Sequence, residues 1–406
     1  MSKSIQEQAK KRGSMTLAIE PFRIAIPDES LGDLRQRLQR ARWPSEIGDN
    51  RHWQAGTNLA YMKQLVAWWL DGYDWRRHEA AMNAVPQFRT VIDEVPIHFQ
   101  HIKGSRRRGD PNPMPLILTH GWPWTFWDWR KVIGPLSDPV AHGGDAADAF
   151  DVIVPSLPGF GFSSPLTKPG VFHANIADLW VKLMDRLGYG RFAAHGADIG
   201  AFVTGFLGHR HPDKLIGIHL QHLVPLRPPL AAPEDYSEQE KPAIAKRAEF
   251  MANGSGYAAI QRTRPQTIAY GMHDSPIGLA AWLIEKRRSW ADSAGDIESV
   301  FSKDDLLTTV CLYWFTDTYL SSAHHYYEPA QKSIDPGFIH DRRPLVEVPV
   351  AGLQFLGDII YHPRKWVETH YNLQKWRVEE KGGHFGAAEK PKVVVDDLRE
   401  FFRPWR

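Results

Sequence analysis

The stretch RFAAHGADIG, residues 191–200, decides how the chain folds. Its first half is a short apolar run typical of a buried strand, and Gly196 to Gly200 then repeat the frame G-x-S-x-G. In that frame a strand turns sharply into a helix, and small flanking residues leave the central side chain exposed as a nucleophile. The central residue here is Asp198 rather than serine. The stretch therefore predicts a strand, a nucleophile turn and a helix, with a carboxylate as the reacting group.

Further apolar runs along the chain resemble this one. Each is followed by a loop rich in glycine, proline or polar residues: PLILTHGWP, FDVIVPSLPGFGFSS, LIGIHLQHL, VPVAGLQFLGD and KWRVEEKGGHF. Helical segments such as 176–187 lie between the runs. This alternation predicts an α/β fold with an open, mostly parallel sheet, whose ligands bind at the carboxyl ends of the strands.

The segment between the runs LIGIHLQHL and VPVAGLQFLGD has no strand signal. It is rich in helix formers and aromatic residues, and we expect an inserted helical cap over the loop face of the sheet. The predicted division of the chain is an N-terminal extension over 1–110, a first part of the α/β core over 111–224, the cap over 225–343 and a second part of the core over 344–406.

The N-terminal extension has its own local signals. Ser30 to Asp33 resemble a capping box, and apolar residues then recur at helical spacing over 31–41. A second amphipathic helix is expected from Leu59 onward, and the segments 88–92 and 97–102 predict two paired strands around a turn at Asp93-Glu94.

Two further loops carry residues that complete a hydrolytic triad. In α/β-hydrolases the nucleophile comes first along the chain, an acid later and a histidine last. Asp198 is followed by Asp358 in FLGDII and by His384 in GGHFGA, each after a predicted strand. This order predicts Asp198 as nucleophile, Asp358 as orienting acid and His384 as base, although Glu347 and Asp317 are other acids within the same half of the chain.

A third loop supplies a candidate oxyanion hole. HGWP, at His120 to Pro123, follows the run PLILT at the position from which such loops donate a backbone N–H. We therefore predict that the backbone N–H groups of Trp122 and Ile199 form the oxyanion hole.

The histidines outside these motifs do not predict a metal site. The sequence has no HExxH motif and no Cys/His ligand cluster, and we expect neither a metal nor a cofactor. These histidines are expected to pack or to face solvent: His209, His211, His219, His222, His324 and His325.

A carboxylate nucleophile favours displacement at carbon. Unlike serine, an Asp with a reference pKa of about 3.9 is anionic at neutral pH without help from a base. Its attack on a saturated carbon yields an alkyl ester, which His384 can then hydrolyse by activating water. The leaving group is either a halide, which needs N–H donors, or an epoxide oxygen, which needs an acid such as tyrosine.

Composition excludes some other classes of function. A net charge of +2, from 49 basic and 47 acidic residues, gives no electrostatic footprint for nucleic acid. The single cysteine, Cys311, suits a reducing compartment, and neither a signal peptide nor a membrane anchor is apparent in the N-terminal residues MSKSIQEQAKKRGSMT. We expect a soluble, cytoplasmic protein.

Over nearly its whole length the chain resembles the epoxide hydrolase family, in the branch similar to microsomal epoxide hydrolase and its soluble bacterial and fungal relatives. The resemblance rests on the extension PFRIAIPDESLGDLRQRLQRARWP, the loop HGWPWTFWDW, the cap segments DSPIGLAAWLIEKRRSW and LYWFTDTYLSS, and the loops GDIIYHPRKW and GGHFGAAE. It implies an α/β-hydrolase fold with an inserted helical cap and an N-terminal extension.

The resemblance also implies roles for two cap tyrosines. Tyr257 in NGSGYAAIQ and Tyr326 in SSAHHYYEP match the tyrosines that assist ring opening, with the adjacent Tyr327 as the alternative to Tyr326. Two features depart from the family: Ile199 stands where many relatives have Trp, and the hydrophobic anchor of membrane-bound relatives is missing. A homodimer is a further expectation from the family.

These inferences predict a cofactor-free enzyme that converts a hydrophobic epoxide and water to a vicinal diol. The alternatives are a haloalkane dehalogenase with the same aspartate nucleophile, in which Trp122, Trp290 and Trp314 are candidate halide donors, and an inactive hydrolase-fold receptor for an apolar ligand.

Overall fold

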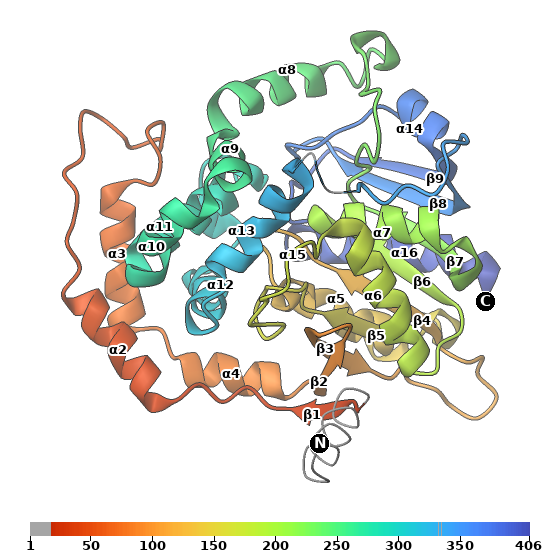
Figure 1. The fold of residues 1–406 in the computed structure, drawn as a ribbon, viewed down its shortest axis with the longest axis horizontal. Coiled ribbons are helices and arrows are strands. Elements are labelled where there is room, and N and C mark those ends of the chain that lie inside the picture. The colour runs from red at the N-terminus through yellow and green to blue at the C-terminus, as the bar shows by residue number, and fades with distance from the viewer. Residues whose placement is uncertain (1–17, 332, 334) are drawn as a thin grey trace, which may run out of the picture.

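In the computed structural model, which describes residues 18–331, 333 and 335–406, a nine-stranded sheet forms the centre of the molecule (Figure 1). The strand order is β1-β2-β3-β5-β4-β6-β7-β8-β9, antiparallel from β1 to the β3/β5 pair and parallel from β5 to β9. The strands are β1 (Glu20–Phe22), β2 (Gln87–Ile92), β3 (Val95–Ile102), β4 (Met114–Thr119), β5 (Phe150–Pro155), β6 (Phe192–Gly196), β7 (Leu215–Leu220), β8 (Val346–Phe355) and β9 (Tyr371–Glu379).

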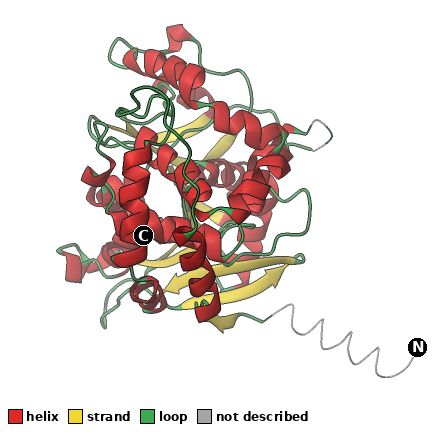
Figure 2. Ribbon diagram, turned by 90° about the vertical axis from the view of Figure 1, so that its left-hand side faces the viewer, coloured by secondary structure: helices red, strands yellow, loops and turns green. Residues whose placement is uncertain are grey.

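The six apolar runs of the sequence become β4 to β9, so the predicted mostly parallel sheet is confirmed. Every residue of β5 and β6 is buried, as expected for strands covered on both faces. Helices α6 and α7 lie on one face and α5 and α16 on the other, and Figure 2 shows the strands between helices. The core helices are α5 (Arg130–Ser137), α6 (His173–Arg186), α7 (Ile199–Arg210), α14 (Arg364–His370), α15 (Gly386–Glu389) and α16 (Pro391–Phe402).

The cap lies between β7 and β8 in the chain and is helical, as predicted. Its helices are α8 (Pro242–Glu249), α9 (Gly256–Thr263), α10 (Pro265–Asp274), α11 (Pro276–Trp290), α12 (Lys303–Phe315) and α13 (Tyr319–Tyr327), with a π-helical segment, Phe250–Gly254, between α8 and α9. The cap therefore begins at the carboxyl end of β7, at the edge of the sheet where the loops that the sequence identifies as functional lie, and the chain re-enters the sheet at the opposite edge, at the amino end of β8.

The N-terminal residues wrap the cap and then enter the sheet. Helices α2 (Asp28–Gln39), α3 (Leu59–Asp71) and α4 (Trp75–Asn83) pack against α11 and α12 (Figure 1). Two contacts hold them there: Arg37 Nη1 bonds Asp274 Oδ1 at 2.9 Å, and Trp68 Nε1 donates to Asp304 Oδ1 at 2.8 Å. Because β1 to β3 extend the main sheet, the extension is not a separate body, and the predicted boundary at 110/111 falls in the loop before β4.

Local predictions for the extension are confirmed except one. Strands β2 and β3 pair around Asp93 and Glu94, which both have positive φ. The prediction of a capping box at Ser30 is wrong, because α2 begins earlier, at Asp28. The residue before it is Pro27, which provides no side-chain cap. The acidic residues Asp28 and Glu29 in its first turn complement the helix dipole instead.

No helix among the described residues has both the length and the apolar character needed to cross a bilayer. The N-terminal residues 1–16, on which the expectation of no signal peptide rests, lie outside the described part of the chain.

Candidate active site

The turn after β6 presents Asp198 at the carboxyl edge of the sheet. Asp198 has φ 54° and ψ −122°, a strained conformation for a residue with a side chain, and α7 begins at the next residue. The turn packs tightly against the end of β4, since a Cβ on Gly200 would lie 2.0 Å from the carbonyl oxygen of Thr119. Small residues are therefore required here, as the G-x-D-x-G frame predicts.

The Asp198 carboxylate lies between two loops. The backbone N–H of Trp122 donates to Oδ1 at 2.8 Å, and His384 Nε2 lies 3.4 Å from Oδ2. Burial opposes ionisation of Asp198, but the His384 imidazole and the Trp122 N–H outweigh burial and lower its pKa. The Asp198 side chain is 12% exposed and the His384 side chain is fully buried, so Asp198 is the more accessible of the two groups.

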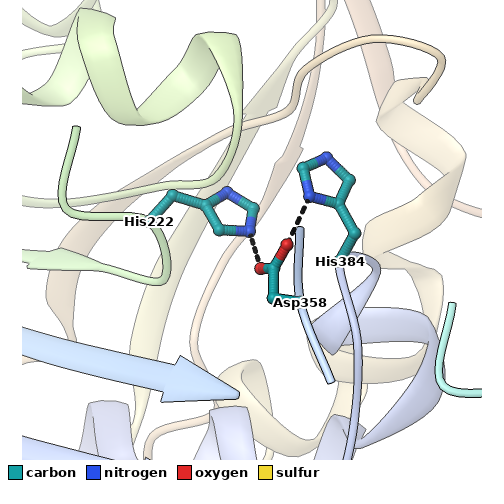
Figure 3. A group of neighbouring side chains, drawn as sticks. All are labelled: His222, Asp358 and His384. Atoms are coloured by element: carbon teal, nitrogen blue, oxygen red, sulfur yellow. Dashed lines mark hydrogen bonds and ion pairs between the residues drawn. The ribbon is translucent and has the colours of Figure 1, made fainter. Parts of the chain in front are cut away.

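Asp358 and His384 follow β8 and β9 and meet beside Asp198 (Figure 3). His384 Nδ1 bonds Asp358 Oδ1 at 3.0 Å, which leaves Nε2 directed at Asp198. Burial alone would raise the pKa of Asp358, but the imidazoles of His222 and His384 hold it well below the ordinary value. Burial would lower the pKa of His384, yet the two carboxylates, Asp358 foremost, raise it to about 9.

The alternative acids lie elsewhere. Glu347 forms an ion pair with Arg342 at 3.0 Å, and its side chain is 45% exposed. Asp317 is 80% exposed and lies 3.8 Å from His273. Of the three candidate acids, Asp358 is the one that bonds His384.

His222, expected to pack or to face solvent, is buried and contacts two of the candidate site residues. It is fully buried after β7; its Nε2 lies 2.5 Å from Asp358 Oδ2 and its Nδ1 accepts the backbone N–H of Asp198 at 2.6 Å (Figure 3). Its ring also stacks on His384 with centroids 4.5 Å apart and planes 13° apart. Its position just past a parallel strand was the signal that sequence reasoning missed.

The other histidines in that group bond away from the triad. Their partners are the Leu345 carbonyl (His209), Asp178 (His211), Asp397 (His219), Glu328 (His324) and the Pro158 carbonyl (His325).

His222, Asp358 and His384 present ligand atoms within 4.8 Å of one another, a donor set that a divalent ion such as Zn²⁺ can use. Each facing nitrogen–oxygen pair is, however, at hydrogen-bond distance, 2.5 Å and 3.0 Å. Protons on the two imidazoles account for this arrangement, so we assign it as a hydrogen-bonded network.

The two cap tyrosines lie together against Trp122. Tyr257, on α9, stacks on Trp122 with centroids 5.1 Å apart and planes 5° apart. Tyr326, on α13, meets Tyr257 edge-on at 5.7 Å and Trp122 at 5.9 Å, whereas Tyr327 packs on His324 at 5.3 Å. Burial is the main cause that raises the pKa of Tyr257 and Tyr326, so both hydroxyls keep their protons at neutral pH.

A buried ion pair joins the cap to the loop that follows β4. Arg287, on α11, bonds both carboxylate oxygens of Asp128, at 2.6 Å and 3.0 Å, and the carbonyl of Pro123 at 2.8 Å. The loop that supplies the Trp122 N–H is thereby fixed to the cap that supplies the tyrosines. Sequence reasoning missed this contact, because both residues lie in ordinary helical segments.

Gly121 must remain glycine for the Asp198 carboxylate to keep its place. A Cβ there would lie 2.3 Å from Asp198 Oδ1. We therefore expect Gly121→Ala to displace the carboxylate from the Trp122 N–H and to lower turnover by about 100-fold or more, the scale for losing one oxyanion donor. The measurement is kcat with a probe epoxide beside the thermal unfolding temperature. Gly32→Ala, at a helical position with open space, is the control, and an unchanged kcat in Gly121→Ala would contradict the geometry.

Comparison with known proteins gives the following matches. A family profile described as "Epoxide hydrolase N terminus" matches residues 19–129, and one described as "alpha/beta hydrolase fold" matches residues 114–253. Two relatives are named epoxide hydrolase. One from Stigmatella aurantiaca is 43% identical over 96% of this chain and 86% of its own, and epoxide hydrolase 1 of Oryctolagus cuniculus is 34% identical over 95% and 88%.

Solved structures agree with these sequence matches. The epoxide hydrolase of Aspergillus niger superposes with a TM-score of 0.82 at 31% identity, covering 97% of this chain and 98% of that one. The juvenile hormone epoxide hydrolase of the silkworm Bombyx mori gives a TM-score of 0.83 at 26% identity, covering 98% and 97%. The α/β-hydrolase fold predicted from the sequence is confirmed.

Proposed function

The chain belongs to the epoxide hydrolase family, and on that premise we propose that it converts a hydrophobic epoxide to a vicinal diol through a covalent ester on Asp198. The observation that carries this proposal is the position of the Asp198 carboxylate, between a backbone N–H and a histidine base and near two buried cap tyrosines. Trp122, Tyr257 and Tyr326 form a cluster of contacting aromatic rings, which favours an apolar substrate.

In the first step, Asp198 Oδ2 attacks one carbon of the epoxide ring. The carbon–oxygen bond to that carbon breaks, and the epoxide oxygen takes a proton from a cap tyrosine, because an alkoxide is a poor leaving group. Oδ1, which already accepts the Trp122 N–H, becomes the carbonyl oxygen of the ester. Trp122 thus holds the carboxylate in one orientation for attack.

In the second step, water attacks the ester carbonyl carbon while His384 Nε2 takes its proton. The developing charge on Oδ1 is stabilised by the Trp122 N–H and, in this proposal, by the Ile199 N–H. Collapse breaks the bond between the carbonyl carbon and Oδ2, the second water proton passes from the intermediate to Oδ2, and the diol leaves while the oxygen of water remains in the Asp198 carboxylate. The proton that His384 takes from water stays on the imidazole, which restores the protonated His384 of the free enzyme.

The charge of Asp198 determines when His384 becomes a base. In the free enzyme the Asp358 and Asp198 carboxylates together raise the pKa of His384 to about 9, so its imidazole is protonated at neutral pH. Ester formation removes the negative charge of Asp198, so the pKa of His384 falls and its proton passes, through water, to the tyrosinate. The base thus becomes available after the ester has formed.

The pH dependence of the two steps follows from this change. Hydrolysis of the ester needs neutral His384, so it is lost as pH falls, with its midpoint below the pKa of about 9 in the free enzyme. Alkylation needs ionised Asp198 and protonated tyrosines. Because the pKa of Asp198 is lowered and the pKa values of Tyr257 and Tyr326 are raised, the rate of alkylation stays constant from about pH 5 to about pH 9. Rapid-quench measurement of both steps checks this. A hydrolysis midpoint at or above pH 9 would contradict it.

The experiment that tests the proposed function is a single turnover of excess enzyme with styrene oxide in H₂¹⁸O. An ester on Asp198 requires unlabelled oxygen in the diol and one ¹⁸O in the peptide containing Asp198. Labelled diol would mean direct attack by water, and no diol with any of a panel of aryl, aliphatic and terpenoid epoxides would overturn the proposal. The cytoplasmic location and the homodimer stay predictions.

A further inference from the structure

His222 has one partner for each ring nitrogen, and both partners belong to the triad. Its Nδ1 lies 2.6 Å from the backbone nitrogen of Asp198, and its Nε2 lies 2.5 Å from Asp358 Oδ2 (Figure 3). It has no exposure, and nothing in the two steps proposed above uses it. The triad is therefore joined to a fourth side chain at its centre.

The partners determine which nitrogen carries the proton. A backbone N–H can only donate, so Nδ1 of His222 is an acceptor, and Nε2 carries the hydrogen that Asp358 Oδ2 accepts. Gln221 Nε2 lies 3.1 Å from the same nitrogen but donates to the His384 carbonyl at 2.8 Å, and two donors do not bond each other. His222 is thus placed as a neutral imidazole protonated at Nε2.

The contacts form a closed path through the nucleophile. From the Asp198 N–H the path runs to His222, to Asp358 Oδ2, from Asp358 Oδ1 to His384 Nδ1, and from His384 Nε2 back to Asp198 Oδ2. Both oxygens of Asp358 are held, so its carboxylate cannot rotate away from His384. The strained main chain of Asp198 is held at the same time.

We propose that His222 is a positioning residue that serves both half-reactions, its Nε2–H fixing Asp358 for ester hydrolysis and its Nδ1 fixing the Asp198 main chain for attack on the epoxide. This inference rests on the proposed function, since it assigns one contact to each proposed step. It also explains why a histidine occupies this position: Nδ1 accepts the Asp198 N–H and Nε2 donates to Asp358 Oδ2, whereas Oδ1 already accepts from His384 Nδ1 and the Ile360 N–H.

Two substitutions separate the contacts. In His222→Asn the amide oxygen takes the place of Nδ1, which keeps the bond from the Asp198 N–H but gives up the donor to Asp358. In His222→Gln the longer amide takes the place of Nε2, which keeps the donor to Asp358 but gives up the acceptor for Asp198. His219→Gln is the matched control, because His219 is equally buried on β7 and bonds Asp397 at 2.8 Å, away from the triad.

Rapid quenching followed by intact mass measurement gives both rates, since the ester appears with alkylation by styrene oxide and disappears with hydrolysis. We expect His222→Asn to slow hydrolysis by about 10- to 100-fold and to accumulate ester, with alkylation nearly unchanged. We expect His222→Gln to slow alkylation by about 10-fold with hydrolysis nearly unchanged. His219→Gln should leave the ratio of the two rates as in the wild type.

Equal slowing of both steps in both variants, in proportion to a fall in the unfolding temperature, would overturn the proposal in favour of a packing role. Unchanged rates would overturn it as well, and so would loss of wild-type activity in EDTA that Zn²⁺ restores, because His222 would then be a metal ligand. The ¹⁵N NMR signals of histidine-labelled wild-type protein are independent of turnover: a protonated Nδ1 in His222 would overturn the inference even if no epoxide were a substrate. Wild-type protein that forms no ester would overturn the proposed function instead.

Discussion

Asp198→Ala is expected to lower diol formation by roughly 10⁴-fold or more, the scale at which removal of a nucleophile or base acts in hydrolase triads. The reason is that the nearby carboxylate cannot replace it: Asp358 is buried, and its two oxygens are bound by the imidazoles of His222 and His384. The measurement is kcat/KM for a probe epoxide, with circular dichroism and the unfolding temperature to show that the variant is folded.

The control for this substitution is Asp317→Asn in the cap. Asp317 also has a positive φ, which asparagine tolerates, but its side chain is 80% exposed and lies away from His384. We expect wild-type turnover in this variant. Removal of a nucleophile lowers the rate by far more than about tenfold. A folded Asp198→Ala enzyme that still forms diol within about tenfold of the wild-type rate would therefore show that water attacks the epoxide directly.

Replacing both cap tyrosines by phenylalanine is the second large effect. Tyr257→Phe with Tyr326→Phe should slow alkylation by about 10²- to 10⁴-fold, the range for general acid catalysis, because the epoxide oxygen then leaves without a proton donor. Each single variant should keep part of the rate, since one hydroxyl remains beside the other ring. The quantity to measure is the rate of ester formation in a single turnover, not the steady-state rate.

Tyr327→Phe provides the matched control, because Tyr327 is the next residue on α13 and packs on His324. Its alkylation rate should equal that of the wild type. If Tyr327→Phe were as impaired as Tyr326→Phe, the register of the cap tyrosine would be wrong; if the double variant alkylated at the wild-type rate, neither tyrosine would act as the acid.

Much of the site could be predicted from the sequence because parallel strands align their carboxyl ends. Asp198, Asp358 and His384 follow β6, β8 and β9, so strand prediction alone places them at one edge of the sheet. The nucleophile frame is local, and its glycines are explained by contacts that leave no room for a side chain. The cap tyrosines came from the family resemblance, because nothing in the surrounding helices distinguishes them from packing aromatics.

Although His222 follows a parallel strand, neither its contacts nor those of Arg287 could be predicted, for a common physical reason. His222 bonds Asp358 and Arg287 bonds Asp128, and each partner lies far away along the chain. These pairings depend on side-chain directions, which the periodicity of apolar residues does not give. The chain has 19 histidines, and any one of them can have an ordinary packing or surface role. What sets His222 apart is its burial between two residues of the candidate triad. Sequence patterns thus located the edges of the site but not the contacts that hold it together.

The ester on Asp198 is the central claim, and intact mass measurement of His384→Gln mixed with styrene oxide tests it most directly. With no base to activate water, the proposed mechanism predicts a mass increase equal to one epoxide, located on the peptide that contains Asp198 and absent from a variant that also carries Asp198→Ala. A wild type that makes diol while His384→Gln shows no adduct, or an adduct on another residue, would contradict the claim.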